Sequence, residues 1–159
     1  MGAAAFIGAL FASAWWEADI RWLHFFQAWM YVATIVLSWS RNRWGYFIGI
    51  GAAAFWNYTN LFVTSFLRAG LNQAAILLHT GRLARPDLFI SVPAWIGNLI
   101  LILGCVLAYI QLSVKSRTDA WKLATACVGT TAYFGLIMAL FQPRYLRLFP
   151  ALLHPHLHL

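Results

Sequence analysis

Charged residues are scarce in this chain of 159 residues, where Asp, Glu, Lys and Arg together make up only 9%. Soluble globular proteins devote roughly a quarter of their residues to these four types. The chain also lacks a polar block long enough to fold as a separate soluble domain. We therefore expect one domain, residues 1–159, that works within a lipid bilayer or at its surface.

Acidic residues are the scarcest charged type, with four Asp and Glu against eleven Lys and Arg and a formal net charge of +7. The basic residues fall in pairs across short loops, a pattern typical of segments that touch anionic lipid head groups. A nucleic-acid partner is therefore not expected. Contacts with anionic head groups are expected at Arg82 and Arg85, which follow a short amphipathic segment, and docking of a partner is the alternative use.

Catalytic motifs are missing as well. The sequence contains no GxSxG, HExxH, Walker A or dinucleotide glycine pattern. No Asp, Glu or Lys lies well inside an apolar segment, so the usual acid–base pairs are absent. The only two cysteines, Cys105 and Cys127, lie in apolar segments and are typical of small buried hydrophobic residues. We predict a protein that is not an enzyme.

Long apolar segments are abundant, and four of them have the length of about twenty residues that a transmembrane helix needs. These predicted spans are residues 22–39, 44–67, 88–111 and 121–141. The shorter segment 3–16 is expected to be an interfacial or partly inserted helix, or alternatively a half-span that plugs against the bundle. Segment 70–80 is predicted to be a short amphipathic helix on the membrane surface, and the tail 143–159 is interrupted by prolines.

The predicted fold class is therefore an all-α integral membrane protein. Four transmembrane helices form a bundle, with an N-terminal interfacial helix and a short amphipathic helix between spans two and three. We expect a multi-pass protein that is located in the bacterial cytoplasmic membrane.

The span 44–67 carries small and polar residues at every fourth position, beginning with Gly45, Gly49, Ala53 and Asn57. On a helix these residues form one narrow stripe where another backbone can approach closely. The same face is expected to continue through Asn60, Thr64 and Arg68. An unpaired amide in hydrocarbon costs several kcal/mol, so this span should lie inside a bundle.

The span 22–39 carries polar residues spaced three and four apart, which places them on one helix face. They are His24, Gln27, Tyr31, Thr34 and Ser38. This face should meet protein, a cofactor or water, while the remaining residues meet lipid. The tight connection 41–43 makes spans 22–39 and 44–67 antiparallel neighbours.

Histidines are the only candidate cofactor ligands. His24 is a candidate axial ligand for a haem or chlorin of a partner subunit, or else a histidine held by a hydrogen bond. His154, His156 and His158 alternate in the tail, a spacing that would place them on one side of an extended chain, where they would hold Zn or Cu; the alternative is a loosely ordered terminus. The sequence itself requires no cofactor.

Nine tryptophans and twelve phenylalanines provide bulky aromatic surface on a bundle without catalytic motifs. Such surface suits packing against other integral membrane proteins, lipids or planar pigments. The leading hypothesis is a non-catalytic accessory subunit of a larger membrane complex, most naturally a respiratory or photosynthetic one. The alternative is a small oligomeric channel or transporter that uses the polar faces of spans 22–39 and 44–67.

Overall fold

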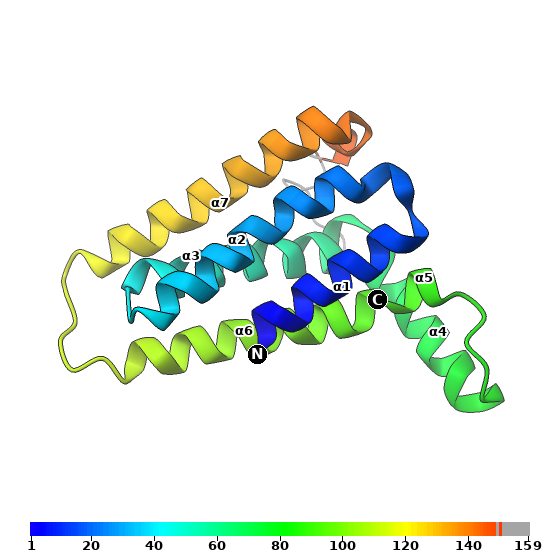
Figure 1. Cartoon of the computed structure of the whole chain (residues 1–159), viewed down its shortest axis with the longest axis horizontal. Helices are drawn as coiled ribbons and strands as arrows, with labels where there is room; N and C mark the ends of the chain where they lie inside the picture. The colour runs from blue at the N-terminus through cyan, green and yellow to red at the C-terminus, as the bar shows by residue number, and fades with distance from the viewer. Residues whose placement is uncertain (149, 151–159) are drawn as a thin grey trace.

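The computed structural model describes residues 1–148 and 150, and every regular element in that part of the chain is helical (Figure 1). This confirms the all-α class. The α-helices are α1 (Gly2–Trp16), α2 (Arg21–Trp39), α3 (Arg43–Tyr58), α4 (Phe66–Thr80), α5 (Pro86–Phe89), α6 (Ser91–Ile110) and α7 (Asp119–Phe141). Tighter 3-10 turns cover Ala18–Ile20 and Pro143–Leu148, and a π-helical turn covers Thr59–Val63.

Two helical segments, Pro86–Ile110 and Asp119–Phe141, are long and apolar enough to cross a membrane. A third crossing is present if Arg43–Val63 and the bent continuation Phe66–Thr80 are counted as one span. These lengths and compositions are consistent with an integral membrane protein. The helix α2 does not meet the same standard, because polar side chains interrupt its apolar sequence.

The helix α3 lies at the centre of the bundle and contacts α2, α6 and α7. Three glycines of α3 make these contacts close. A Cβ atom on Gly45 would lie 2.5 Å from the backbone nitrogen of Ser38 in α2. A Cβ atom on Gly49 would lie 2.8 Å from Sγ of Cys105 in α6, and one on Gly51 would lie 2.8 Å from Oγ1 of Thr130 in α7. Three neighbours can therefore pack around one helix.

The N-terminal helix α1 packs lengthwise against α2 and α6 (Figure 1), which favours the second of the two predictions for this segment, a half-span that packs against the bundle. Its start lies beside the middle of α6, where a Cβ atom on Gly2 would be 2.6 Å from the carbonyl oxygen of Gly97. Ala3, Phe6 and Leu10 are buried. Packing against the bundle therefore buries more of the apolar surface of α1 against protein than a position away from the bundle would.

The predicted span 44–67 is not one continuous helix, because the helical run that begins at Arg43 breaks after Val63. The chain turns by 79° between Arg43–Val63 and Phe66–Thr80, and α4 leaves the bundle as an arm. Near the break the Thr59 hydroxyl donates a hydrogen bond to the carbonyl of Phe55 at 2.8 Å, and the Thr64 hydroxyl accepts one from the amide of Phe66 at 3.4 Å. Hydroxyl groups that bond to nearby backbone compete with the helical ladder and bend helices.

We call the end of the bundle formed by residues 40–43 and 111–118 the hairpin end. There the buried carboxylate of Asp119 joins several elements. It accepts hydrogen bonds from Arg43 of α3 at 2.9 and 3.0 Å and from the Tyr109 hydroxyl of α6 at 3.1 Å. The backbone amide of Ser116 and the ammonium of Lys122 donate to the same carboxylate. One acidic residue thus ties the starts of α3 and α7 to the end of α6.

We predict that Asp119→Asn lowers the unfolding temperature of the protein in detergent by several degrees. The amide accepts fewer hydrogen bonds than the carboxylate and leaves Arg43 without its ion pair. The matched control is Asp87→Asn, which removes an exposed pair with Arg85 at the other end of the bundle. Equal melting temperatures for the two variants would show that the Asp119 network does not hold the helices together.

We predict that Gly45→Ala destabilises the protein by about 1 to 3 kcal/mol, because the new methyl group would collide with α2 backbone that cannot move aside. The control is Gly104→Ala in α6, where a Cβ atom would have no other atom within 4 Å. The control should be neutral or slightly stabilising, since Ala favours helix over Gly. The free energy of unfolding of both variants is measured in mixed micelles. If Gly45→Ala lowers it no more than Gly104→Ala does, the close approach of α2 and α3 at Gly45 is refuted.

Candidate functional site

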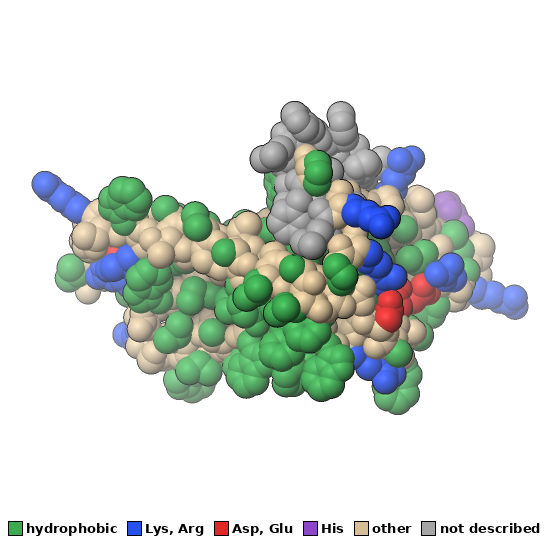
Figure 2. Space-filling model, turned by 90° about the horizontal axis from the view of Figure 1, so that it is seen from above, with side chains coloured by type: hydrophobic (Ala, Val, Ile, Leu, Met, Phe, Trp, Pro, Cys, Tyr) green, Lys and Arg blue, Asp and Glu red, His purple; other side chains and the backbone are tan. Residues whose placement is uncertain are grey.

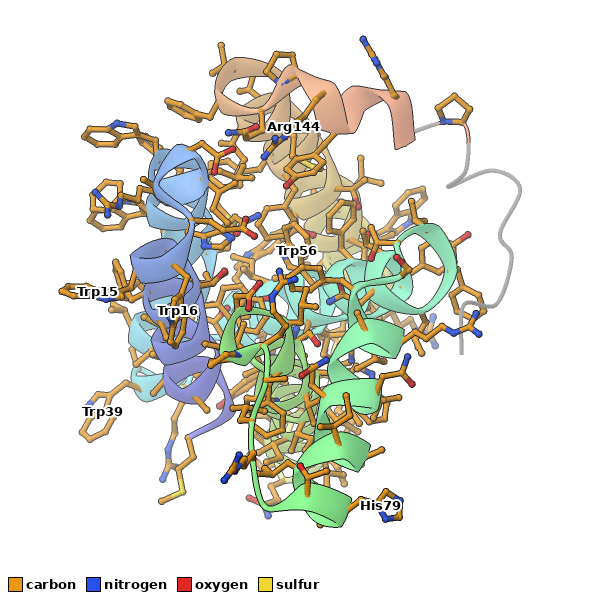
Figure 3. The ribbon with its side chains drawn as sticks, turned by 90° about the vertical axis from the view of Figure 1, so that its right-hand side faces the viewer. Trp15, Trp16, Trp39, Trp56, His79 and Arg144 are labelled. Atoms are coloured by element: carbon orange, nitrogen blue, oxygen red, sulfur yellow. The ribbon has the colours of Figure 1, made fainter. Side chains whose placement is uncertain are left out.

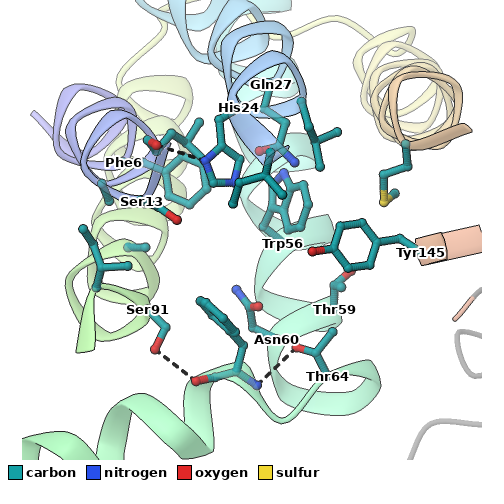
Figure 4. Close-up of a pocket in the computed structure, with 18 of the residues that line it drawn as sticks. Phe6, Ser13, His24, Gln27, Trp56, Thr59, Asn60, Thr64, Ser91 and Tyr145 are labelled. Carbon is teal, nitrogen blue, oxygen red and sulfur yellow. Dashed lines mark hydrogen bonds between the residues drawn. The ribbon is translucent and has the colours of Figure 1, made fainter. Parts of the chain in front are cut away.

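A cavity of about 180 Å³ lies at the end of the bundle opposite the hairpin end. We call this the cavity end. The walls come from α1, α2, α3, the π-helical turn, the start of α6 and the end of α7 (Figure 4). Most of the lining is apolar, and the polar side chains that reach the cavity include His24, Gln27, Thr59 and Asn60. The cavity can therefore accept an apolar molecule with a small number of polar groups.

The polar residues reach the cavity because two local patterns coincide. In α2, His24 and Gln27 are three residues apart and lie on one face. In the chain after α3, the π-helical turn Thr59–Val63 widens the helix and directs Thr59, Asn60 and Val63 to the cavity. Single π-helical turns of this kind occur frequently at functional sites.

His24 is anchored by its Nδ1 atom, which lies 3.0 Å from the carbonyl oxygen of Leu10 in α1. A carbonyl oxygen only accepts hydrogen bonds, so Nδ1 carries the proton and donates. The other ring nitrogen, Nε2, then keeps its lone pair. That nitrogen can accept a hydrogen bond or bind a metal, and a backbone partner on Nδ1 is the usual support of a ligating histidine.

Gln27 and Trp56 present buried polar atoms that have no hydrogen-bond partner among the described residues. They are the side-chain oxygen Oε1 of Gln27 and the indole nitrogen Nε1 of Trp56. Gln27 is only 1% exposed. Both residues line the cavity and lie on the same side of it as His24 (Figure 4). Buried polar groups without partners are rare in folded proteins and often mark a site for water or a ligand.

Below the cavity the polar residues pack into the core. The Tyr31 hydroxyl donates a hydrogen bond to Oδ1 of Asn98 in α6 at 3.1 Å, and the Phe6 ring stacks on Tyr31 with centroids 4.3 Å apart. Asn57 is buried with both polar side-chain atoms unpartnered among the described residues. This layer separates the cavity from the hairpin end.

The predicted site residues fall into three groups in the structure. Those that line the cavity are His24, Gln27, Asn60 and Thr64. Those buried between helices are Tyr31, Gly45, Gly49, Ala53 and Asn57. Arg68 lies on α4, exposed and outside the cavity, so the expectation that it continues the stripe of α3 is corrected by the break after Val63.

Three residues of this region were not selected from the sequence. Trp56 supplies the unpartnered indole nitrogen, Asn98 pairs with Tyr31, and Tyr145 lines the cavity from beyond α7. Asn98 had a visible signal, since it is a single amide within an apolar run. The contribution of Tyr145 depends on how the chain folds back after Phe141, which no local pattern specifies.

Metal-binding groups do not gather anywhere in residues 1–148 and 150, where no three His, Cys, Asp or Glu side chains lie close enough to hold one ion. His154, His156 and His158 lie outside the described residues. The chain matches no protein-family model, no curated protein and no solved structure.

We predict opposite stability effects for two conservative changes in α2. Gln27→Leu should stabilise the empty protein by about 1 kcal/mol, because it removes a buried acceptor without a partner. Tyr31→Phe should destabilise it by roughly 1 kcal/mol, because Asn98 loses its partner. Unfolding in mixed micelles measures both values. A destabilised Gln27→Leu variant would show that the amide oxygen of Gln27 is already satisfied.

Proposed function

We propose that this protein is a non-catalytic accessory subunit that packs against other subunits of a larger membrane assembly. The observation that carries the proposal is a continuous aromatic surface on the outer side of α1 and α2. We call this surface the aromatic face. It consists of Phe11, Trp15, Trp22, Phe25 and Trp29, each at least 40% exposed.

In the proposed arrangement four helices cross the bilayer, namely α2, α3, α6 and α7. The polar residues that lower the hydropathy of α2, including Gln27, Tyr31 and Thr34, are buried against other helices and do not meet lipid. Trp22 and Trp39, exposed at the two ends of α2, are separated by about 25 Å of helix. That spacing suits aromatic belts at the two membrane interfaces.

The arm formed by α4 supports the same arrangement. It turns by 79° from the line of α3, so it would lie nearly in the plane of the membrane when α3 crosses it. Its apolar residues Leu71 and Leu78 are exposed. An interfacial helix buries such residues among lipid chains.

The loop that follows α4 carries the proposed lipid contacts. The carboxylate of Asp87 accepts hydrogen bonds from Arg85, which raises the pKa of the guanidinium and keeps it charged. The guanidinium of Arg82 has no such partner among the described residues and is exposed. We propose that Arg82 and Arg85 meet anionic head groups beside this arm.

The aromatic face differs from the other outer surfaces of the bundle. Exposed residues of α6 and α7 are mainly aliphatic, such as Leu103 and Leu140, which suits contact with lipid chains. On α2 the rings of Trp22, Phe25 and Trp29 follow one another edge to face, with centroids 6.1 Å apart at each step. Figure 2 shows the largest hydrophobic cluster on the side of the molecule where α1 and α2 run, and Figure 3 shows Trp15 and Trp39 projecting from that side.

A groove of about 660 Å³ crosses the aromatic face between α1 and α2. Phe11, Trp15, Trp22 and Phe25 line it, and Arg21 is held at its edge by a hydrogen bond to the carbonyl of Ala14. Rigid aromatic side chains around a groove are typical of the central contacts of protein interfaces. The occupant that we propose is a transmembrane helix of a host subunit. The host would be a respiratory or photosynthetic complex, since indole rings pack well on haem or chlorin pigments.

We predict that the triple variant Trp22→Leu, Phe25→Leu, Trp29→Leu no longer co-migrates with a large complex. Native membranes are extracted in mild detergent, separated by size and examined by mass spectrometry and absorption spectroscopy. The control variant Trp121→Leu removes an exposed tryptophan at the start of α7, outside the aromatic face, and should still co-migrate. Co-migration of the wild type with a pigmented or haem-bearing complex supports the proposal. A wild-type chain that migrates alone contradicts it.

The cavity favours a second candidate, the small oligomeric channel or transporter. Gln27 of α2 and Asn60 of the π-helical turn line the same cavity, so the two predicted polar faces meet there. A passage would have to continue through the layer of Tyr31 and Phe134, both of which are fully buried. Migration of the wild type as a small colourless homo-oligomer would favour this candidate.

A further inference from the structure

We infer that the cavity at the cavity end binds a neutral, largely apolar molecule that carries a hydroxyl group, which Gln27 and Trp56 recognise. This inference does not depend on the accessory function, because the cavity lies inside the bundle and the aromatic face lies outside it.

The two unpartnered atoms that belong to residues lining the cavity are of opposite kinds. Oε1 of Gln27 can only accept a hydrogen bond, and the indole N–H of Trp56 can only donate one. A hydroxyl group both donates and accepts, so one hydroxyl can satisfy both. A carbonyl would leave Gln27 without a donor, and an ammonium would leave Trp56 without an acceptor. His24, whose Nε2 keeps its lone pair, adds a second acceptor on the same side (Figure 4).

The volume and the lining of the cavity indicate what the rest of the bound molecule is like, apart from its hydroxyl group. Its volume of about 180 Å³ exceeds the roughly 150 Å³ that holds benzene in an engineered protein cavity. Phe6, Phe55 and Phe66 contribute aromatic walls. A single water occupies about 30 Å³ and needs two to four polar partners, so water alone would fill this space poorly. A ring or short chain bearing the hydroxyl fits both the volume and the apolar lining.

Fluorinated aromatic probes test the inference directly. Fluorine NMR titrations of the full chain in nanodiscs compare 4-fluorophenol, which has the hydroxyl, with 4-fluorotoluene, which has a methyl group of similar size. In the wild type we expect 4-fluorophenol to bind at least about fivefold more tightly than 4-fluorotoluene, because one net hydrogen bond strengthens binding by about this factor. Each probe's affinity is corrected for its own partition into protein-free nanodiscs, so that the two probes and all variants are compared on the same basis.

Variants connect the preference to the two residues. Gln27→Leu should abolish the preference for 4-fluorophenol, and Trp56→Phe should reduce it. Gln27→Met is a second way to remove the acceptor if Gln27→Leu does not fold. Gln111→Leu alters an exposed glutamine at the end of α6 and should preserve the wild-type preference. Ala9→Leu fills part of the cavity from α1 and should weaken both probes.

Three outcomes would overturn the inference. Equal affinity of the two probes for the wild type would show that the hydroxyl is not recognised. A preference that survives both Gln27 variants would place recognition elsewhere. Binding of neither probe would show that the cavity is filled by water or by neighbouring side chains. None of these results bears on co-migration with a complex, so the two proposals fail separately.

Discussion

The close approach of α3 to its neighbours is the constraint on which the bundle depends. Gly45, Gly49 and Gly51 leave room for the backbone or short side chains of α2, α6 and α7 around one helix. In hydrocarbon there is no hydrophobic force between helices, so association depends on dense packing and buried hydrogen bonds. A central helix with small residues allows both, and the outer helices can then carry bulky side chains on their outer faces.

Buried polar side chains along the bundle include both satisfied and unsatisfied groups. At the hairpin end Asp119 accepts hydrogen bonds from several elements, and in the core Tyr31 pairs with Asn98. At the cavity end the polar atoms of Gln27 and Trp56 have no partner among the described residues. Both polar atoms of Asn57 and the side-chain nitrogen of Asn98, in the core, also have no partner there. The cavity end differs from the core because its unpartnered atoms belong to residues that line a cavity.

The outer surfaces show a similar division. The α6 and α7 surfaces are aliphatic and resemble ordinary lipid contacts, whereas the α1 and α2 surface is aromatic and grooved. The half-length helix α1 creates this difference, because it packs beside α2 and adds its own rings to those of Trp22 and Phe25. Without α1 in this position there would be no groove, and the cavity would lose the wall that anchors His24.

The sequence by itself determined the helical class, the apolar segments and the residues of the two polar faces, because these follow from composition and from periodicity along a single helix. It also indicated that Gly45 and Gly49 share one side of a helix. Only the tertiary structure decided that α1 enters the bundle, that the helix after Val63 turns aside and takes Arg68 with it, and that Trp56 and Tyr145 reach the cavity. The physical reason is that these features depend on contacts between residues far apart in the chain and on competition between hydroxyl groups and the helical ladder, neither of which leaves a periodic pattern.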